Sequence, residues 1–271
     1  MPFIAIKHED TRRIAGMSFI LLIMTLGVAA YSGLWWIPAV SVTAFLGISL
    51  QIAHYHRAAE EERIFQDQDI QDLQFIQSAL EPVHPLPYFT RWSSSPALAA
   101  RLIGLIKTNR PKRIVELGSG VSTLVMAYAA RQAGVGEVTS LDHDAVYADI
   151  TRRNLTAHGL SEVARVLDAP LIDVQTSRGR RTWYDVAALA DLKDIDLLIV
   201  DGPPRKSGPD ARWPAFDLLQ SRLAPGAIVV LDDTVRRDEK ASVDSWSAIA
   251  QPGSVQQIPS RKGVTILKMP G

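Results

Sequence analysis

The most conspicuous pattern in the chain is a long uncharged stretch near the N-terminus. Residues 14–53 contain no Asp, Glu, Lys, Arg or His. A helix needs about 20 apolar residues to cross the hydrocarbon core of a bilayer, so this stretch is long enough for two helices. The sequence Tyr31-Ser32-Gly33 is the expected turn between them. We therefore predict a transmembrane helical hairpin, with helices at about 14–30 and 34–53.

Basic residues flank both predicted helices: Lys7, Arg12 and Arg13 precede the first, and Arg57 and Arg63 follow the second. The turn carries no charge, and Trp35 and Trp36 beside it suit an interfacial aromatic belt. Because basic residues are retained on the cytoplasmic side, both ends are expected in the cytoplasm. This predicts a multi-pass protein of the cell inner membrane with a cytoplasmic tail at 1–13. A cleavable signal sequence and a buried hairpin of a soluble protein remain as alternatives.

A polar, helical segment follows the uncharged stretch. Its apolar positions Ile70, Leu73, Ile76 and Leu80 recur every three or four residues, which gives a helix with one apolar stripe. Prolines at 82, 85 and 87 then interrupt the pattern. We predict a linker helix within 54–83 and a separate domain over 84–271.

Strand and helix patterns alternate in that domain. Apolar runs typical of buried strands cover 113–120, 137–144, 164–171, 195–202 and 227–233. Helical patterns cover 96–106, 122–132, 145–158 and 215–223. Such alternation predicts a parallel sheet with helices on both faces. The last two strand patterns, 254–260 and 263–269, are separated only by Arg261-Lys262, so they must pair antiparallel. The expected fold class is α/β, with a mostly parallel sheet that ends in an antiparallel hairpin.

Composition excludes several classes of function. The chain has 29 basic and 29 acidic residues and a formal net charge of zero, which argues against nucleic-acid binding through bulk positive charge. It has no cysteine, so disulfides, thiolate nucleophiles and cysteine-ligated zinc are ruled out.

Acidic residues lie at the end of every predicted parallel strand: Glu116, Asp142, Asp168, Asp201 and the pair Asp232-Asp233. A single carboxylate after a strand is usually a cap or a turn residue. Ligands of open α/β sheets bind beyond the carboxyl ends of the strands, however, and here acids collect along that whole edge. Gly118 and Gly120 after the first strand also allow the backbone to approach a ligand closely. The edge is therefore the candidate site.

Over roughly residues 90–271 the sequence resembles the class I S-adenosylmethionine-dependent methyltransferases. The segment VELGSG at 115–120 is similar to the first motif of that family, and the terminal hairpin is similar to its sixth and seventh strands. The resemblance implies a seven-stranded, Rossmann-like sheet that binds S-adenosylmethionine. The residues that it implies for the cofactor site are Glu116, Gly118, Ser119 and Gly120 near the methionine moiety, Asp142 on the ribose, Asp168 and Ala169 near the adenine, and Asp201. His143, which follows the ribose acid, either borders the adenine or is a solvated turn residue.

A narrower resemblance concerns a metal. Asp201 and the pair Asp232-Asp233 look like the metal ligands of catechol and caffeoyl-CoA type O-methyltransferases, which have Asp-Asn where this chain has Asp-Asp. The resemblance implies Mg²⁺ at these three aspartates and a catalytic role for Asp201, since hard oxygen ligands suit that ion. Against it, Pro204 stands where that family has its catalytic lysine. The alternative is that Asp201 faces the cofactor while Asp232 and Asp233 cap the next segment.

Aromatic and basic clusters in predicted loops are weaker candidates. Trp183-Tyr184-Asp185 and Arg212-Trp213 either line an acceptor pocket or pack the loops. Arg91 and Trp92 are candidates for a lid, and the basic run 178–181 is expected to be a solvated loop.

These patterns together predict a membrane-anchored methyltransferase that acts on an oxygen of a small-molecule, lipid-linked or glycan acceptor. A nicotinamide-dependent oxidoreductase is the alternative enzyme, although Thr123 stands where the dinucleotide fingerprint has its third glycine. A membrane-tethered binding module of the same fold is the alternative without catalysis. The sequence does not predict an oligomeric state.

Overall fold

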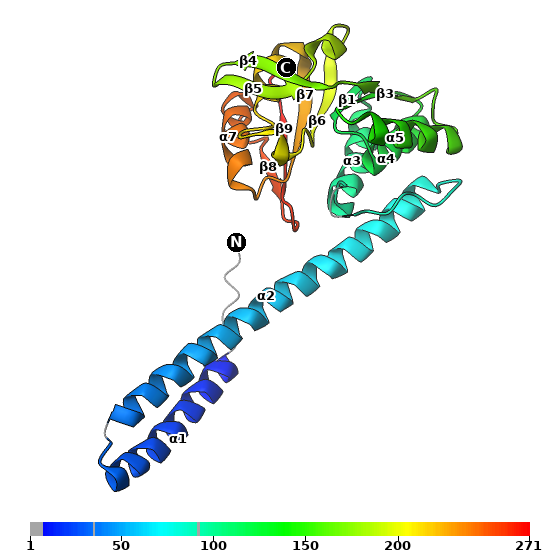
Figure 1. Ribbon diagram of the computed structural model, residues 1–271. Helices are drawn as coiled ribbons and strands as arrows, with labels where there is room; N and C mark the ends of the chain where they lie inside the picture. The colour runs from blue at the N-terminus through cyan, green and yellow to red at the C-terminus, as the bar shows by residue number, and fades with distance from the viewer. Residues whose placement is uncertain (1–7, 35, 91–92) are drawn as a thin grey trace. The chain divides into compact units, whose positions relative to one another are not determined.

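The computed structural model describes residues 8–34, 36–90 and 93–271 (Figure 1). Contacts within the chain divide it into two compact units that meet between Ile64 and Phe65, inside helix α2. Four residues of the sequence predictions lie outside the described residues: Lys7, Trp35, Arg91 and Trp92.

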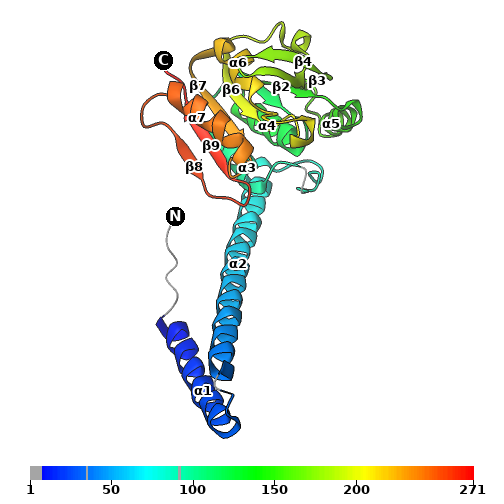
Figure 2. The same cartoon turned by 60° about the vertical axis from the view of Figure 1, so that its left-hand side comes forward.

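Two antiparallel helices make up the first unit, α1 (His8–Ser32) and the first part of α2 (Trp36–Leu80) (Figures 1 and 2). Gly33 ends α1 with a positive φ of 71°, and its N–H donates to the Ala29 carbonyl oxygen at 2.8 Å. Among the described residues, α2 is the helix that is long and apolar enough to cross a membrane, and α1 has a shorter apolar stretch at Phe19–Ser32. The predicted helices and turn are present, whereas the crossing of a membrane remains a prediction.

A seven-stranded sheet is the centre of the second unit. Its strands are β1 (Arg113–Leu117), β2 (Glu137–Asp142), β3 (Ala164–Asp168), β6 (Ile195–Val200), β7 (Leu223–Asp232), β8 (Gln256–Ile258) and β9 (Val264–Lys268). Their order is β3-β2-β1-β6-β7-β9-β8. The first five are parallel, and β9 is antiparallel to both β7 and β8. The predicted fold class is confirmed, and the strand order reverses between β1 and β6.

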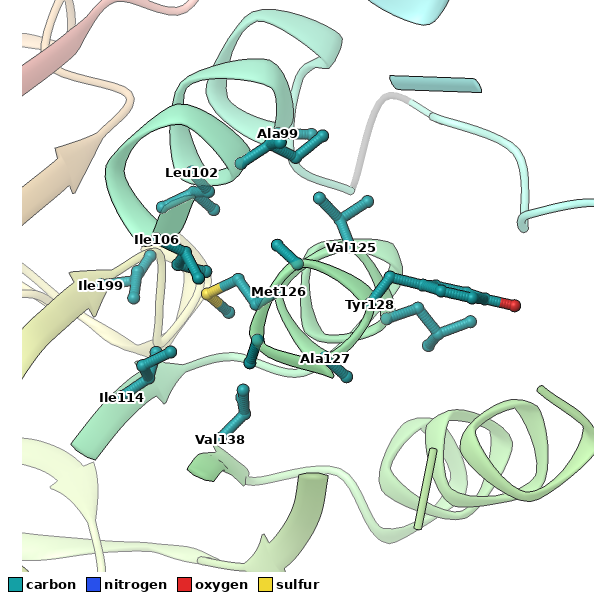
Figure 3. Close-up of a cluster of buried hydrophobic side chains, with 14 of the residues drawn as sticks. Ala99, Leu102, Ile106, Ile114, Val125, Met126, Ala127, Tyr128, Val138 and Ile199 are labelled. Carbon is teal, nitrogen blue, oxygen red and sulfur yellow. The ribbon is translucent and has the colours of Figure 1, made fainter. Parts of the chain in front are cut away.

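Helices cover both faces of this sheet (Figure 2): α3 (Pro96–Asn109), α4 (Val121–Ala133) and α5 (Ala145–Ala157) on one, α6 (Pro214–Leu219) and α7 (Lys240–Ile249) on the other. Alternate residues of each strand face opposite layers, so Ile114 of β1 packs with the α3–α5 layer and Val115 with the α6–α7 layer. Figure 3 shows the first layer, in which Ile106 and Met126 lie over Ile114. Short 3-10 helices occupy Val186–Leu189, Arg205–Ser207, Gln220–Arg222 and Arg237–Glu239.

The last turns of α2 belong to this second unit. Ile76 and Leu80 are buried in its core, and the Gln132 side chain donates to the Leu80 carbonyl oxygen at 2.9 Å. Ile70 and Leu73, the earlier half of the predicted stripe, are exposed. Only the final part of the stripe therefore packs on the sheet domain.

An additional hairpin is the main departure from the sequence prediction. Strands β4 (Leu171–Thr176) and β5 (Gly179–Tyr184) form a separate antiparallel two-stranded sheet, so the predicted solvated loop at 178–181 is wrong. Gly179 at the turn has a φ of 87°, which favours glycine. The Arg178 guanidinium stacks on Trp213, 3.7 Å from the ring centroid, and Ser177 donates to Asp217 through its N–H and hydroxyl. These contacts hold the hairpin against α6.

Candidate active site at the carboxyl edge of the sheet

The loop after β1 is the first part of the site. The Gly118 N–H donates to the Leu141 carbonyl oxygen at 2.8 Å, and the Asp201 N–H donates to that of Leu117 at 3.2 Å. Gly118 has a φ of 100°, and a Cβ added there would lie 3.6 Å from the Asp201 backbone. The backbone conformation therefore favours glycine, and the loop lies within van der Waals distance of the end of β6.

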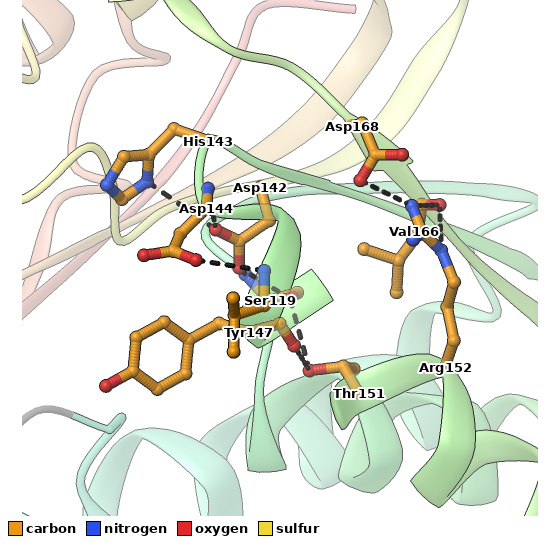
Figure 4. A network of polar contacts seen from close by, with 10 residues as sticks. Ser119, Asp142, His143, Asp144, Tyr147, Thr151, Arg152, Val166 and Asp168 are labelled. Atoms are coloured by element: carbon orange, nitrogen blue, oxygen red, sulfur yellow. Dashed lines mark hydrogen bonds and ion pairs between the residues drawn. The ribbon is translucent and has the colours of Figure 1, made fainter. Parts of the chain in front are cut away.

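Asp142 at the end of β2 is held by several donors (Figure 4). Its Oδ2 accepts from the Ser119 N–H at 3.1 Å and from the Ser119 hydroxyl at 2.6 Å, and its Oδ1 accepts from the Asp144 N–H at 3.0 Å. Burial is the largest influence on its pKa and raises it, but the hydrogen bonds from His143, Ser119 and Asp144 together hold the pKa of Asp142 below its ordinary value. Asp142 is thus an anion at neutral pH.

The end of β3 continues the same edge. Asp168 is half exposed and forms an ion pair with Arg152, 2.7 Å between Oδ1 and Nη2 (Figure 4). Ala169 is buried, and its N–H donates to the Asp142 carbonyl oxygen at 2.7 Å. The predicted cofactor residues after β1, β2 and β3 therefore form one continuous line.

Glu116 does not reach the surface of the site. Its carboxylate is fully buried and accepts from the Ser122 hydroxyl and the Thr123 hydroxyl, both at 2.5 Å, and from the Ser140 hydroxyl. Burial outweighs these three bonds and raises the pKa of Glu116 to about 7. The Glu116 side chain therefore connects β1 with the start of α4 and with β2. It lies beneath the loop that was predicted to hold the methionine moiety.

Tyr184 at the end of β5 is a residue whose position the sequence left open. It is fully buried, and its ring lies 6.4 Å from the His143 ring after β2. Its hydroxyl lies against Gly202 after β6, where an added Cβ would be only 2.2 Å away. Since β1 lies between β2 and β6 in the sheet, the side chain crosses the carboxyl end of β1. The hydroxyl has no hydrogen-bond partner among the described residues.

A second acidic cluster lies after β6 and β7. Asp201, Asp232 and Asp233 each offer one carboxylate oxygen, and these oxygens lie within 4.8 Å of one another. The structure thus brings together the three aspartates that the sequence grouped.

A cation of the chain itself lies among them. Arg212 is 4% exposed, and its Nη2 donates to Asp201 Oδ1 at 3.1 Å and to Asp233 Oδ2 at 2.6 Å. Its Nη1 donates to the Asp232 carbonyl oxygen at 2.7 Å. Burial alone would lower the pKa of Arg212, but the surrounding carboxylates, Asp201 and Asp233 foremost, raise it. Arg212 is therefore permanently charged at the centre of the cluster.

The donors left for a metal ion differ from those expected. The second oxygen of Asp201 accepts from the Ser94 hydroxyl at 2.9 Å, so both of its oxygens are engaged. Within the described part of the chain, the buried carboxylate oxygens without a partner are both oxygens of Asp232 and Oδ1 of Asp233. Burial and the charges of Asp201 and Asp233 raise the pKa of Asp232 well above its ordinary value. A three-aspartate site for Mg²⁺ does not fit this arrangement, because the positive charge of Arg212 already lies between Asp201 and Asp233.

Residues 115–234 match the protein family described as "Methyltransferase domain". The match begins in β1 and ends just after Asp233, so both acidic clusters and Arg212 lie inside the matched segment, whereas Ser94 lies outside it.

Solved structures share the fold. A protein from Klebsiella pneumoniae, described provisionally as an O-methyltransferase, is 18% identical over 79% of this chain and 97% of its own, with a TM-score of 0.50. An O-methyltransferase from Bacillus cereus in complex with SAH is 18% identical over 75% and 90%, with a TM-score of 0.49. A methyltransferase from Geobacter sulfurreducens is 16% identical over 81% and 97%, with a TM-score of 0.48. A comparison with curated protein sequences finds no match. The likeness to the first of these structures shows that the sheet domain has a Rossmann-like methyltransferase fold.

Proposed function

We propose that the protein is an S-adenosylmethionine-dependent methyltransferase that transfers a methyl group to an oxygen of its acceptor. The observation that carries the proposal is the pairing of Gly118 with Asp142: a close backbone turn after β1 beside an anionic carboxylate after β2, within a matched methyltransferase domain. The cofactor supplies an electrophilic methyl group on its sulfonium when it is bound.

The residues along the edge fit such a cofactor. The Asp142 carboxylate would accept hydrogen bonds from the ribose hydroxyls, which would replace those that it accepts from the Ser119 hydroxyl and His143. The loop 118–120 would hold the methionine moiety, and Asp168 and Ala169 would border the adenine. Tyr184 crosses the end of β1 beside these groups, so the proposed binding mode requires its ring to turn away.

Asp201 is the proposed catalytic residue at the acceptor end. Methyl transfer is an in-line displacement, for which a protein supplies mainly positioning and a proton acceptor. The Asp201 side chain is 17% exposed, more than that of Asp233 at 5%. Each of its oxygens has a second lone pair beyond the bonds to Ser94 and Arg212, so it can receive the proton of an acceptor hydroxyl.

The proposed setting is the cytoplasmic face of the cell inner membrane, with residues 14–53 as the anchor. Support comes from the uncharged sequence and from the exposed apolar side chains of the first unit, for example Phe19, Ile23, Ile48 and Leu50. An acceptor that is small, lipid-linked or a glycan is consistent with that setting. The full-length protein should sediment with membranes and need detergent, whereas a chain lacking residues 1–53 should be soluble and bind SAH within a few-fold of the full-length affinity.

Calorimetry with two ligands tests the activity class. The detergent-solubilised full-length protein should bind SAH and should not bind NAD⁺. Binding of NAD⁺ without SAH would instead support the oxidoreductase alternative. Binding of SAH without transfer of labelled methyl groups to any component of membrane extracts would support the binding module.

A further inference from the structure

We infer that Arg212 is the resident cation of the Asp201–Asp232–Asp233 cluster and that this methyltransferase works without a divalent metal ion. The inference rests on the proposed function, and it departs from the Mg²⁺ site that these aspartates suggested by resemblance. It assigns to an arginine of the chain the charge that a metal would otherwise supply.

The guanidinium connects the ends of two strands. From one side it contacts Asp201 after β6, through Oδ1 at 3.1 Å and through the backbone carbonyl oxygen at 2.9 Å. From the other it contacts the Asp232 carbonyl oxygen at 2.7 Å and Asp233 Oδ2 at 2.6 Å. The planar fork of an arginine satisfies such a set of acceptors, and the point charge of a lysine does not.

Its charge cannot be removed from the cluster. Arg212 is almost fully buried, and a guanidinium does not lose its proton in proteins. A divalent ion bound by Asp201 would have to share an oxygen with Arg212 or Ser94 and lie beside a fixed positive charge. The divalent ion and the Arg212 guanidinium would repel each other strongly, because little water screens charges inside a buried cluster.

Two further charges complete the arrangement. Glu239 lies 3.8 Å from Arg212 Nε, and Arg236 Nη1 lies 2.8 Å from Asp233 Oδ2. Asp233 is thus held by two arginines, and Arg212 is surrounded by acids on three sides. Arg212 therefore acts as a positioning residue that fixes the Asp201 carboxylate at the edge of the site.

Titration with Mn²⁺, followed by electron paramagnetic resonance, tests the inference directly. The full-length wild-type protein should show no stoichiometric Mn²⁺ binding, and its Tm should be the same in Mg²⁺ and in EDTA. The variant R212M should bind one Mn²⁺ at least about tenfold more tightly than wild type, because its carboxylates have lost their cation. The control R205M removes an exposed arginine that pairs with Asp238 outside the cluster, and it should behave as wild type.

Stoichiometric Mn²⁺ binding by the wild type would overturn the inference, as would SAH-sensitive methyl transfer that EDTA abolishes and Mg²⁺ restores. A folded R212M protein without a new Mn²⁺ site would also contradict it. If R212M does not fold, the wild-type titration still decides. The Mn²⁺ readout does not depend on cofactor binding, so a failure of the proposed function appears separately, as a protein that binds no SAH.

Discussion

Two acidic clusters lie on the same edge of one sheet and are stabilised in different ways. After β1 and β2, Glu116 and Asp142 accept hydrogen bonds from hydroxyls and backbone N–H groups. After β6 and β7, Asp201 and Asp233 are bound by the guanidinium of Arg212. The first cluster, Glu116 and Asp142, is thus held by the dipoles of hydroxyl and N–H groups, and we call it the dipole-held cluster. The second, Asp201, Asp232 and Asp233, is held by the buried positive charge of Arg212, and we call it the charged cluster.

The difference follows from what comes after each strand. β1 and β2 lead directly into α4 and α5, whose first turns present free N–H groups and cap residues such as Ser122, Thr123 and Asp144. β6 and β7 lead into irregular segments with single 3-10 turns at Arg205–Ser207 and Arg237–Glu239. Where the helix N-terminus is missing, a charged side chain takes its place. This explains why similar acids along one edge are held by hydroxyl and N–H donors at one cluster and by an arginine side chain at the other.

The largest effect is expected from removing that charge. R212M should lower the free energy of unfolding by about 3–5 kcal/mol, because it leaves carboxylates buried without a partner. R236M, which removes a more exposed partner of Asp233, should cost no more than about 1 kcal/mol. Urea unfolding followed by circular dichroism measures both. Equal losses for the two variants would show that the cluster does not depend on its buried cation.

The dipole-held cluster should make the free energy of unfolding depend on pH. The pKa of Glu116 is about 7 in the folded chain and ordinary, near 4.5, in the unfolded chain. Between these two pH values Glu116 is protonated in the folded chain and ionised in the unfolded chain, so a rise in pH favours unfolding. The free energy of unfolding therefore falls as pH rises from about 4.5 to 7, by up to about 3 kcal/mol. E116Q should remove this part of the slope. Parallel pH–stability curves for the two proteins would contradict the assignment.

Cofactor affinity should respond to the dipole-held cluster alone. D142A should weaken SAH binding at least about tenfold, because charge-assisted hydrogen bonds are worth about 1.5–3 kcal/mol. The control D149A removes another carboxylate of the same region, which pairs with Arg153 on the exposed face of α5, and should leave affinity unchanged. Calorimetry distinguishes them, and unchanged binding by D142A would remove this residue from the site.

The smallest effect is expected at Tyr184, between the two clusters. Y184F deletes a buried hydroxyl that has no partner among the described residues and should stabilise the protein by up to about 1 kcal/mol. Thermal unfolding measures the change. A loss of more than about 1 kcal/mol would mean that the hydroxyl has a partner that this arrangement does not include.

The sequence predicted the dipole-held cluster better than the charged one. Asp142 and Gly118 could be placed because the carboxyl ends of parallel strands lie at one edge of the sheet. The helical patterns that follow these two strands were also regular. Arg212 lies in an irregular segment with no periodicity, so nothing in its neighbourhood specified which way its side chain would turn. The grouping of Asp201 with Asp232 and Asp233 followed from topology, but the identity of their cation did not.

The hairpin β4–β5 was missed for a related reason. Its strands are short, and the alternation from Leu171 to Tyr184 is obscured by arginines at 180 and 181, which read as a solvated run. The turn residues Ser177-Arg178-Gly179 were the available signal. Helix α7, a short element before the terminal hairpin, was also not predicted.

The position of Tyr184 has a kinetic consequence. If the cofactor lies across the end of β1 as proposed, it and the Tyr184 ring need the same volume, and it binds only to the fraction of molecules in which the ring has turned away. The apparent dissociation constant is the intrinsic one divided by that fraction. Association then saturates at the rate of ring opening as ligand concentration increases, and replacing the ring with a smaller side chain speeds capture more than it slows release. The end of β5 would in this way limit the rate at which the ligand is captured.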